Sequence, residues 1–124
     1  MPSTDEIRTL VLRYVDLLQS GTGEELASLF ADDAVVEDPI GTEPKVGHQA
    51  ILAHYSDVAA RDTHSEMLAL RVVDNEAAAN FRVAMKLPDG RAIDVEPIDT
   101  FVVDERSRIT SLRVYLGDDE IRVT

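Results

Sequence analysis

The spacing of apolar residues changes midway along the chain, and this change restricts the possible folds strongly. Through Ala59 the apolar residues recur every three or four positions, which is typical of helices with one buried face. From Phe81 onward they alternate with polar residues, which is typical of half-buried strands. Helices followed by a meander of strands predict an α+β fold in which the helices pack on one face of a curved sheet.

Capping patterns place the helices of the first half. Ser3-x-x-Glu6 and Thr22-x-x-Glu25 each have the form of a capping box, so we expect helices to start after them. The second helix is expected to extend to Phe30, and a third to occupy residues 47–59. One face of the first helix carries the apolar residues Ile7, Leu10, Val11, Tyr14, Val15, Leu17 and Leu18.

Strands are predicted on both sides of the third helix. Residues 34–38 are expected to form a short strand that ends before Pro39, because proline is confined to the ends and edges of sheets. In the second half we predict strands over residues 81–87, 93–103 and 112–116, with turns at 88–90 and 104–107.

Length and charge restrict the partners. The 124 residues are expected to form one domain over 1–124. Twenty-four acidic residues against 12 basic ones give a net charge of −12, so we expect no nucleic-acid partner and favour a neutral, apolar ligand. No segment approaches the roughly 20 apolar residues of a membrane span, and the N-terminus lacks a signal-like run. We therefore expect no membrane partner and a cytoplasmic location.

Residues of the usual metal and nucleophile sites are scarce. The chain has no cysteine, which excludes disulfides and thiolate chemistry. His48, His54 and His64 lack the spacing of a metal site, and neither a phosphate-binding glycine loop nor a serine-hydrolase elbow occurs. We expect no metal and no cofactor.

Asp99 is the most informative candidate residue. It shares strand parity with four apolar residues, so it is expected to point into the core, where an unpaired carboxyl tends to hold a proton. The alternative is that a bend at Pro97 turns Asp99 toward water. The residues that share its parity are Ile93, Val95, Phe101 and Val103.

Tyr14 and Asp38 are more ambiguous. Tyr14 lies on the buried face of the first helix, where its hydroxyl needs a partner, and a backbone carbonyl is the ordinary one. Asp38 ends the first predicted strand and precedes Pro39, which is common for a turn residue. A catalytic base at this position is the other interpretation.

Five segments carry a resemblance to a known family: Arg13–Val15, Leu29–Ala34, Val36–Pro39, Gly47–Tyr55 and Pro97–Asp99. They resemble the bacterial ketosteroid isomerases (steroid Δ5-isomerases) of the nuclear-transport-factor-2-like and SnoaL-like superfamily, over nearly the whole chain. The resemblance implies a cone-shaped, curved mixed sheet with three N-terminal helices around a deep apolar pocket. It also implies a homodimer.

The resemblance further implies a reaction that needs no cofactor. Asp38 matches the general base, and Tyr14 and Asp99 match the two donors to an enolate oxygen. The substrate would be a small, apolar 3-oxo-Δ5-steroid, isomerised to its Δ4-conjugated ketone through a dienolate. The matching substrate-binding residues are Tyr55, which supports Tyr14, with Phe81, Leu112 and Leu116.

The chain departs from the family at several pocket positions. Phe30 stands where some members carry a further tyrosine, so a shorter hydrogen-bond network is expected. Leu116 replaces a large aromatic residue, and Met85 also lies in the expected pocket without a ring.

Two other functions are open on the same fold. A cyclase-like or epoxide-hydrolase-like enzyme is one, and the epoxide hydrolases of this fold use an Asp-Arg-Asp set around a water. Arg82 and Arg113 fall on the outward parity of their predicted strands, which disfavours this option. A non-catalytic ligand-binding module is the other, since fold alone does not define function.

Overall fold

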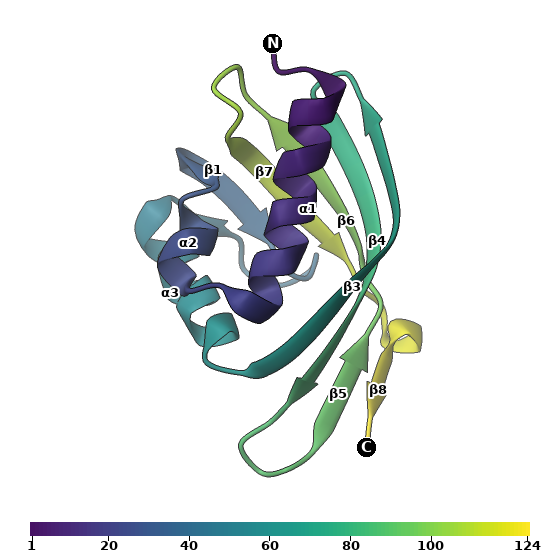
Figure 1. Ribbon diagram of the computed structural model, residues 1–124. Helices are drawn as coiled ribbons and strands as arrows, with labels where there is room; N and C mark the ends of the chain where they lie inside the picture. Colours follow the sequence, from purple (N-terminus) through teal and green to yellow (C-terminus); the bar gives the residue numbers. More distant parts are fainter.

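A strongly curved sheet holds three helices against its concave face (Figure 1). The computed structural model describes all residues, 1–124. The helices are α1 (Thr4–Ser20), α2 (Gly23–Ala27) and α3 (His48–Ala59). The strands are β1 (Phe30–Glu37), β2 (Lys45–Val46), β3 (Asp62–Val73), β4 (Glu76–Lys86), β5 (Ala92–Val95), β6 (Ile98–Val103), β7 (Ile109–Tyr115) and β8 (Ile121–Val123), with a one-turn 3-10 helix, η1 (Asp118–Glu120), before β8.

The sheet is mixed, which confirms the predicted α+β class. Its strand order is β2-β1-β7-β6-β4-β5-β8, and β3 pairs along the other edge of β4. The β1–β7 pairing is parallel, and the remaining pairings are antiparallel. The long strand β4 is shared, because its first half pairs with β6 and its second half with β5.

Helix α1 forms where its capping box predicts. The Ser3 hydroxyl accepts from the backbone N–H of Glu6, and the Glu6 carboxylate accepts from the backbone N–H of Ser3. The predicted stripe is buried against the sheet, apart from half-buried Leu10. The C-terminal half of the helix is bound to β3, because the Ser65 hydroxyl donates to the Val15 carbonyl at 2.6 Å.

The second helix is shorter than predicted. It ends at Ala27, and Phe30 belongs to β1 rather than to α2. The reason is a nonlocal one: Phe30 pairs with Ile109 of β7, and the Ile109 N–H donates to the Leu29 carbonyl at 2.9 Å. These sheet contacts take up the backbone groups that would otherwise have continued the helix.

Gly23 lets α2 pack closely on α3. A Cβ at this position would lie 2.6 Å from the Ser56 Cα, which is closer than side chains approach a backbone. The absence of a side chain at Gly23 therefore sets the position of α3, the helix that carries His54 and Tyr55.

The predicted strand over residues 93–103 is wrong as a continuous strand. It is broken at Glu96 and Pro97 into β5 and β6, because proline has no N–H to donate to the ladder. The Pro97 carbonyl still accepts from the Phe81 N–H at 3.4 Å, so both halves remain joined to β4.

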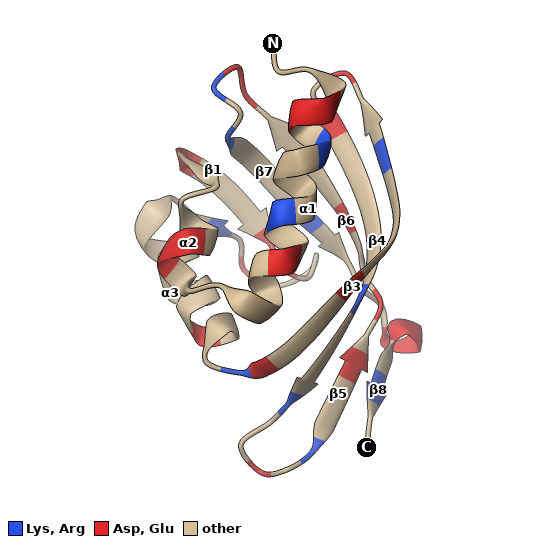
Figure 2. Cartoon of the chain, in the orientation of Figure 1, with Lys and Arg blue, Asp and Glu red and all other residues tan.

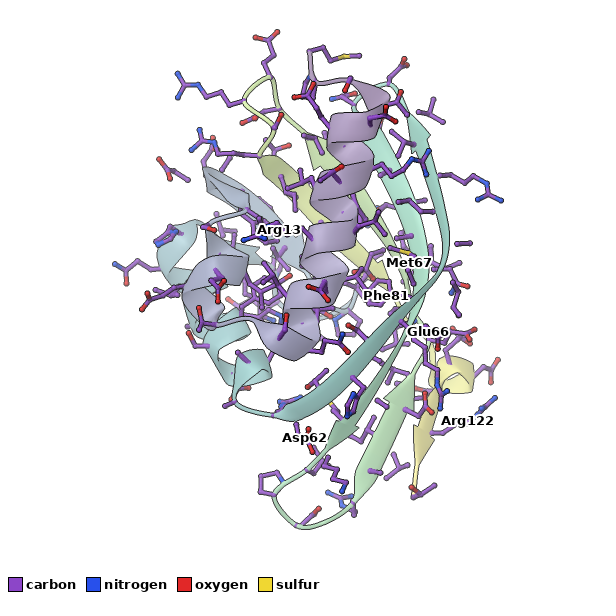
Figure 3. All side chains as sticks on the ribbon, viewed as in Figure 1. Arg13, Asp62, Glu66, Met67, Phe81 and Arg122 are labelled. Atoms are coloured by element: carbon purple, nitrogen blue, oxygen red, sulfur yellow. The ribbon has the colours of Figure 1, made fainter.

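Three strands were not predicted: β2, β3 and β8. In β3 a register shift between Met67 and Ala69 leaves Leu68 exposed and interrupts the alternation. Strand β8 is three residues long and exposed throughout. Figure 3 labels Met67 and its register partner Phe81 where β3 and β4 run beside α1, and both pack in or against the core.

Charged residues are spread over the surface. Figure 2 shows acidic residues on α1, α2, β5 and η1, which lie in different parts of the molecule. No helix combines the length and apolar character that crossing a membrane requires.

Candidate active site

A cavity of about 360 Å³ lies between α1, α3 and the concave face of the sheet. Odd-numbered residues of β4 form one wall, and Pro97 and Asp99 continue it across the break between β5 and β6. The polar residues that line it are Tyr14, Asp38, His54, Tyr55, Asp57, Arg61 and Asp99. The cavity is therefore largely apolar, with most of its hydrogen-bonding groups supplied by α1, α3 and the end of β1.

Six of the seven site residues expected from the sequence line this cavity. They are Tyr14, Asp38, Tyr55, Phe81, Asp99 and Leu116. Leu112 does not line it, which corrects that expectation. Leu112 is fully buried in the core, where its register partners are Phe101 of β6 and Val36 of β1. Farther along the chain, Val114 and Leu116 do line the cavity.

Tyr14 and Tyr55 form a buried pair at the bottom of the cavity. Their hydroxyls are hydrogen-bonded at 2.8 Å, so the partner of Tyr14 is a side chain and not the backbone carbonyl favoured by the pattern alone. Phe30 stacks on the Tyr55 ring and meets Tyr14 edge-on, without extending the hydrogen-bond network. Burial raises the pKa of both phenols well above the usual value, and neighbouring carboxylates add to this. Both are therefore neutral at physiological pH and can donate.

Asp99 is buried in the way that strand parity predicts. Its side chain lies on the same face as buried Phe101, and the residue is only 1% exposed. The chain does bend at Pro97, but β6 resumes with Asp99 facing the cavity and Ile98 facing outward. The Oδ1 atom of Asp99 has no hydrogen-bond partner in the protein.

The environment of Asp99 favours its neutral form. Burial raises the pKa of Asp99 well above the usual range, and the charge of Asp38 raises it further. A protonated carboxyl at this position carries an O–H donor toward the cavity.

Asp38 has a different environment. It follows β1, on the face of buried Ala34 and Val36, and its side chain is 25% exposed. The peptide bond to Pro39 is cis. The Asp38 Oδ2 atom lies 2.9 Å from the His54 Nε2 atom. The cavity thus holds two acidic side chains with different partners. Asp38 contacts an imidazole nitrogen, and the Asp99 Oδ1 atom has no partner.

The sequence interpretation missed His54 and Arg61. The spacing of the histidines addresses only metal binding, and the one pointer to the cavity is the place of His54 beside Tyr55 on a predicted helix. Arg61 lies beside the cavity, where it donates to the Asp57 carboxylate at 3.3 Å. No group of three or more His, Asp or Glu side chains is arranged to hold a metal ion.

Arg82 and Arg113 lie outside the cavity, as their parity predicts. Arg82 forms an ion pair with Asp94, and Arg113 donates to Glu37 at 3.1 Å. Neither guanidinium is available to the Asp38–Asp99 pair.

The raised pKa of Asp99 predicts a pH-dependent difference between wild type and Asp99→Asn. Below about pH 4 the carboxyl is protonated in both folded and unfolded chains. Above that pH the unfolded chain ionises and the folded chain does not, so wild type should lose about 1.4 kcal/mol of unfolding free energy per pH unit relative to Asp99→Asn. Urea unfolding at pH 4, 5.5 and 7 measures this.

The matched control for this measurement is Asp33→Asn, on the exposed part of β1. A difference between wild type and Asp99→Asn that does not change with pH would show that Asp99 ionises equally in both states.

Comparisons with known proteins agree with this architecture. Residues 11–112 match the SnoaL-like domain family. The steroid Delta-isomerase of Nocardioides simplex is 36% identical over 119 residues, which cover 96% of this chain and 96% of that protein.

Two solved structures superpose closely. The Δ5-3-ketosteroid isomerase of Mycobacterium sp. has a TM-score of 0.86 at 27% identity, over 96% of this chain and 98% of that one. The epoxide hydrolase/cyclase-like enzyme SalBIII, described in pyran ring formation in polyether salinomycin, has a TM-score of 0.92 at 20% identity over 100% of both chains, and so shares the fold. Because the family match covers most of the chain and the isomerase aligns over nearly its full length, this chain belongs to the SnoaL-like, NTF2-like family and is a homologue of the steroid Delta-isomerases.

Proposed function

We propose that the protein converts a 3-oxo-Δ5-steroid to its Δ4-conjugated isomer by intramolecular proton transfer. The observation that carries the proposal is the joint exposure of Asp38, Tyr14 and Asp99 to one apolar cavity. The homology to a steroid Delta-isomerase supports the same class of reaction.

In this mechanism Asp38 is the base. Its carboxylate removes a proton from the carbon between the ketone and the double bond, and the electron pair moves onto the ketone oxygen as a dienolate. Asp38 then returns the proton at the far end of the conjugated system, which moves the double bond. No atom is gained or lost, so one carboxylate serves both steps.

Tyr14 and Asp99 stabilise the dienolate oxygen. Both are buried, neutral donors, and hydrogen bonds to a developing charge are strongest where the donors are shielded from solvent. A second ionised carboxylate beside the dienolate would repel it, so the protonated state of Asp99 is essential to the mechanism. Tyr55 holds the Tyr14 hydroxyl in place through the 2.8 Å bond.

An epoxide-opening or cyclising enzyme is the second candidate. An ionised carboxylate and a protonated one in the same cavity can also remove a proton from a hydroxyl nucleophile and donate one to an epoxide oxygen. Arg61 lines the cavity, but its guanidinium donates to Asp57 and Met85 and to neither acid, which disfavours an Asp-Arg-Asp arrangement around a water. Parallel assays with a Δ5-3-ketosteroid and with an epoxy alcohol separate the two candidates.

The convex face of the sheet supports a homodimer. Ile98 and Tyr115 are register partners on β6 and β7, and they remain 48% and 47% exposed. A shallow groove of about 710 Å³ adjoins them. We propose that a second copy covers this apolar pair.

The base assignment predicts the effect of Asp38→Asn. The amide cannot accept the substrate proton, so kcat should fall by about 10² to 10⁴. Binding of an equilenin-like phenol should persist, because Tyr14 and Asp99 are unchanged. Absorbance of the conjugated enone measures turnover, with Asp33→Asn as the control, and wild-type turnover in Asp38→Asn would rule out Asp38 as the base.

The donor assignment predicts a loss of transition-state stabilisation in Asp99→Leu. The leucine fills the same buried space without an O–H, so kcat should fall by about 10² to 10³ while the chain stays folded. The fraction of a bound phenol that is ionised should fall too, as its absorbance spectrum reports. An unchanged rate and an unchanged spectrum would place the oxyanion site elsewhere.

The dimer proposal predicts that Ile98→Arg yields monomers. The guanidinium would have to be buried against an apolar partner surface, which is costly. Sedimentation velocity of wild type, Ile98→Arg and the control Val73→Glu (exposed at the end of β3) measures the oligomeric state. Wild-type protein that sediments as a monomer contradicts the proposal.

A further inference from the structure

His54 contacts the proposed base directly and has no role in the mechanism above. Its Nε2 atom lies 2.9 Å from the Asp38 Oδ2 atom, and its side chain is 17% exposed. The imidazole also meets the Tyr55 ring edge-on, with 4.8 Å between centroids and 73° between planes. Contacts to two neighbours hold the ring in one orientation.

We infer that His54 is a positioning residue for Asp38, an inference that rests on the proposed function. In this arrangement His54 donates its Nε2–H to Oδ2, which leaves Oδ1 free to face the substrate. Asp38 needs such a partner, because it follows the end of β1 and its side chain reaches solvent. A carboxylate that turned toward water would no longer face the substrate carbon from which it removes the proton.

The same hydrogen bond separates the roles of the two acids. A donor to a carboxylate stabilises its charged form, whereas burial without a donor stabilises the neutral form. Asp38 has the imidazole donor, and Asp99 has an Oδ1 atom with no partner. The two acids of the cavity therefore differ in their partners: Asp38 has the hydrogen bond that a base needs to keep its orientation, and Asp99 has none at Oδ1.

The hydrogen bond also suits the return of the proton. When Asp38 has taken the substrate proton, its contact with the imidazole loses its charge-assisted character. Transfer of the proton back to the dienolate restores that contact. His54 therefore favours the form of Asp38 that begins and ends the cycle.

The other charged and titratable groups that line the cavity with His54 are either bonded to one another or buried. Tyr14 of α1 and Tyr55 of α3 are bonded to each other, and Arg61 is bonded to Asp57, which precedes it on α3. Asp99 of β6 lines the same cavity and is held neutral by burial. Asp38 is the one hydrogen-bonded partner of the His54 ring.

Replacement of His54 by phenylalanine and by glutamine tests the inference. Phenylalanine keeps a ring against Tyr55 and removes the donor, so kcat should fall about 10-fold with KM changed less than about twofold. Glutamine, which can still donate, should restore most of kcat.

His48→Phe is the matched control, since His48 lies exposed on the first turn of the same helix. It should leave both kcat and KM at wild-type values. A wild-type kcat in His54→Phe would overturn the inference. Equal losses in His54→Phe and His54→Gln, with a lower melting temperature in both, would overturn it in favour of a purely structural role.

A second measurement does not depend on turnover. Nitrogen-15 NMR of the histidine rings should show His54 protonated at Nε2 in wild type, with a changed signal in Asp38→Ala. If wild type fails to isomerise any Δ5-3-ketosteroid, the proposed function fails, yet this comparison still tests the pairing. His54 ring signals that are the same in wild type and Asp38→Ala would overturn the pairing itself.

Discussion

The burial of the Asp99 carboxyl is the constraint on which the site depends. Nothing in the protein donates to its Oδ1 atom, and the charge of Asp38 acts on it across the same cavity. Both effects favour the neutral acid, and only a neutral acid can act as a donor toward a developing oxyanion. The cavity would lose this property if water or a cation reached Asp99, so the apolar wall around it has a chemical role as well as a packing role.

The apolar wall beside Asp99 comes from β4 and from the two shorter strands, β5 and β6, that pair with it. Strand β4 is continuous, whereas its neighbour is divided at Pro97 into β5 and β6. Because both segments pair with the same strand, their inward residues remain in line, and Val95, Pro97 and Asp99 face one cavity. The helices complete the enclosure, with α1 and α3 each contributing one tyrosine.

The sequence predicts what local periodicity can encode. The capping boxes, the buried face of α1 and the inward direction of Asp99 all follow from patterns within a few residues. Phe30 was misplaced because its strand depends on parallel pairing with Ile109, far away in the chain. The contact between His54 and Asp38 joins α3 to the end of β1, and no local sequence pattern in either segment predicts this contact. The resemblance to a family supplied Asp38, for which the local pattern offered only a turn.

The floor and the rim of the cavity differ in how they are anchored. Tyr14, Tyr55 and Asp99 are buried in the core, whereas Arg61 and Asp57 lie at a half-open edge that contributes little to packing. Substitutions at the rim therefore cost little stability, while substitutions at the floor must also fit the packing of the core. Over evolutionary time such a molecule can exchange one substrate for another by changes at the rim alone, while the floor residues assigned here to proton transfer are retained.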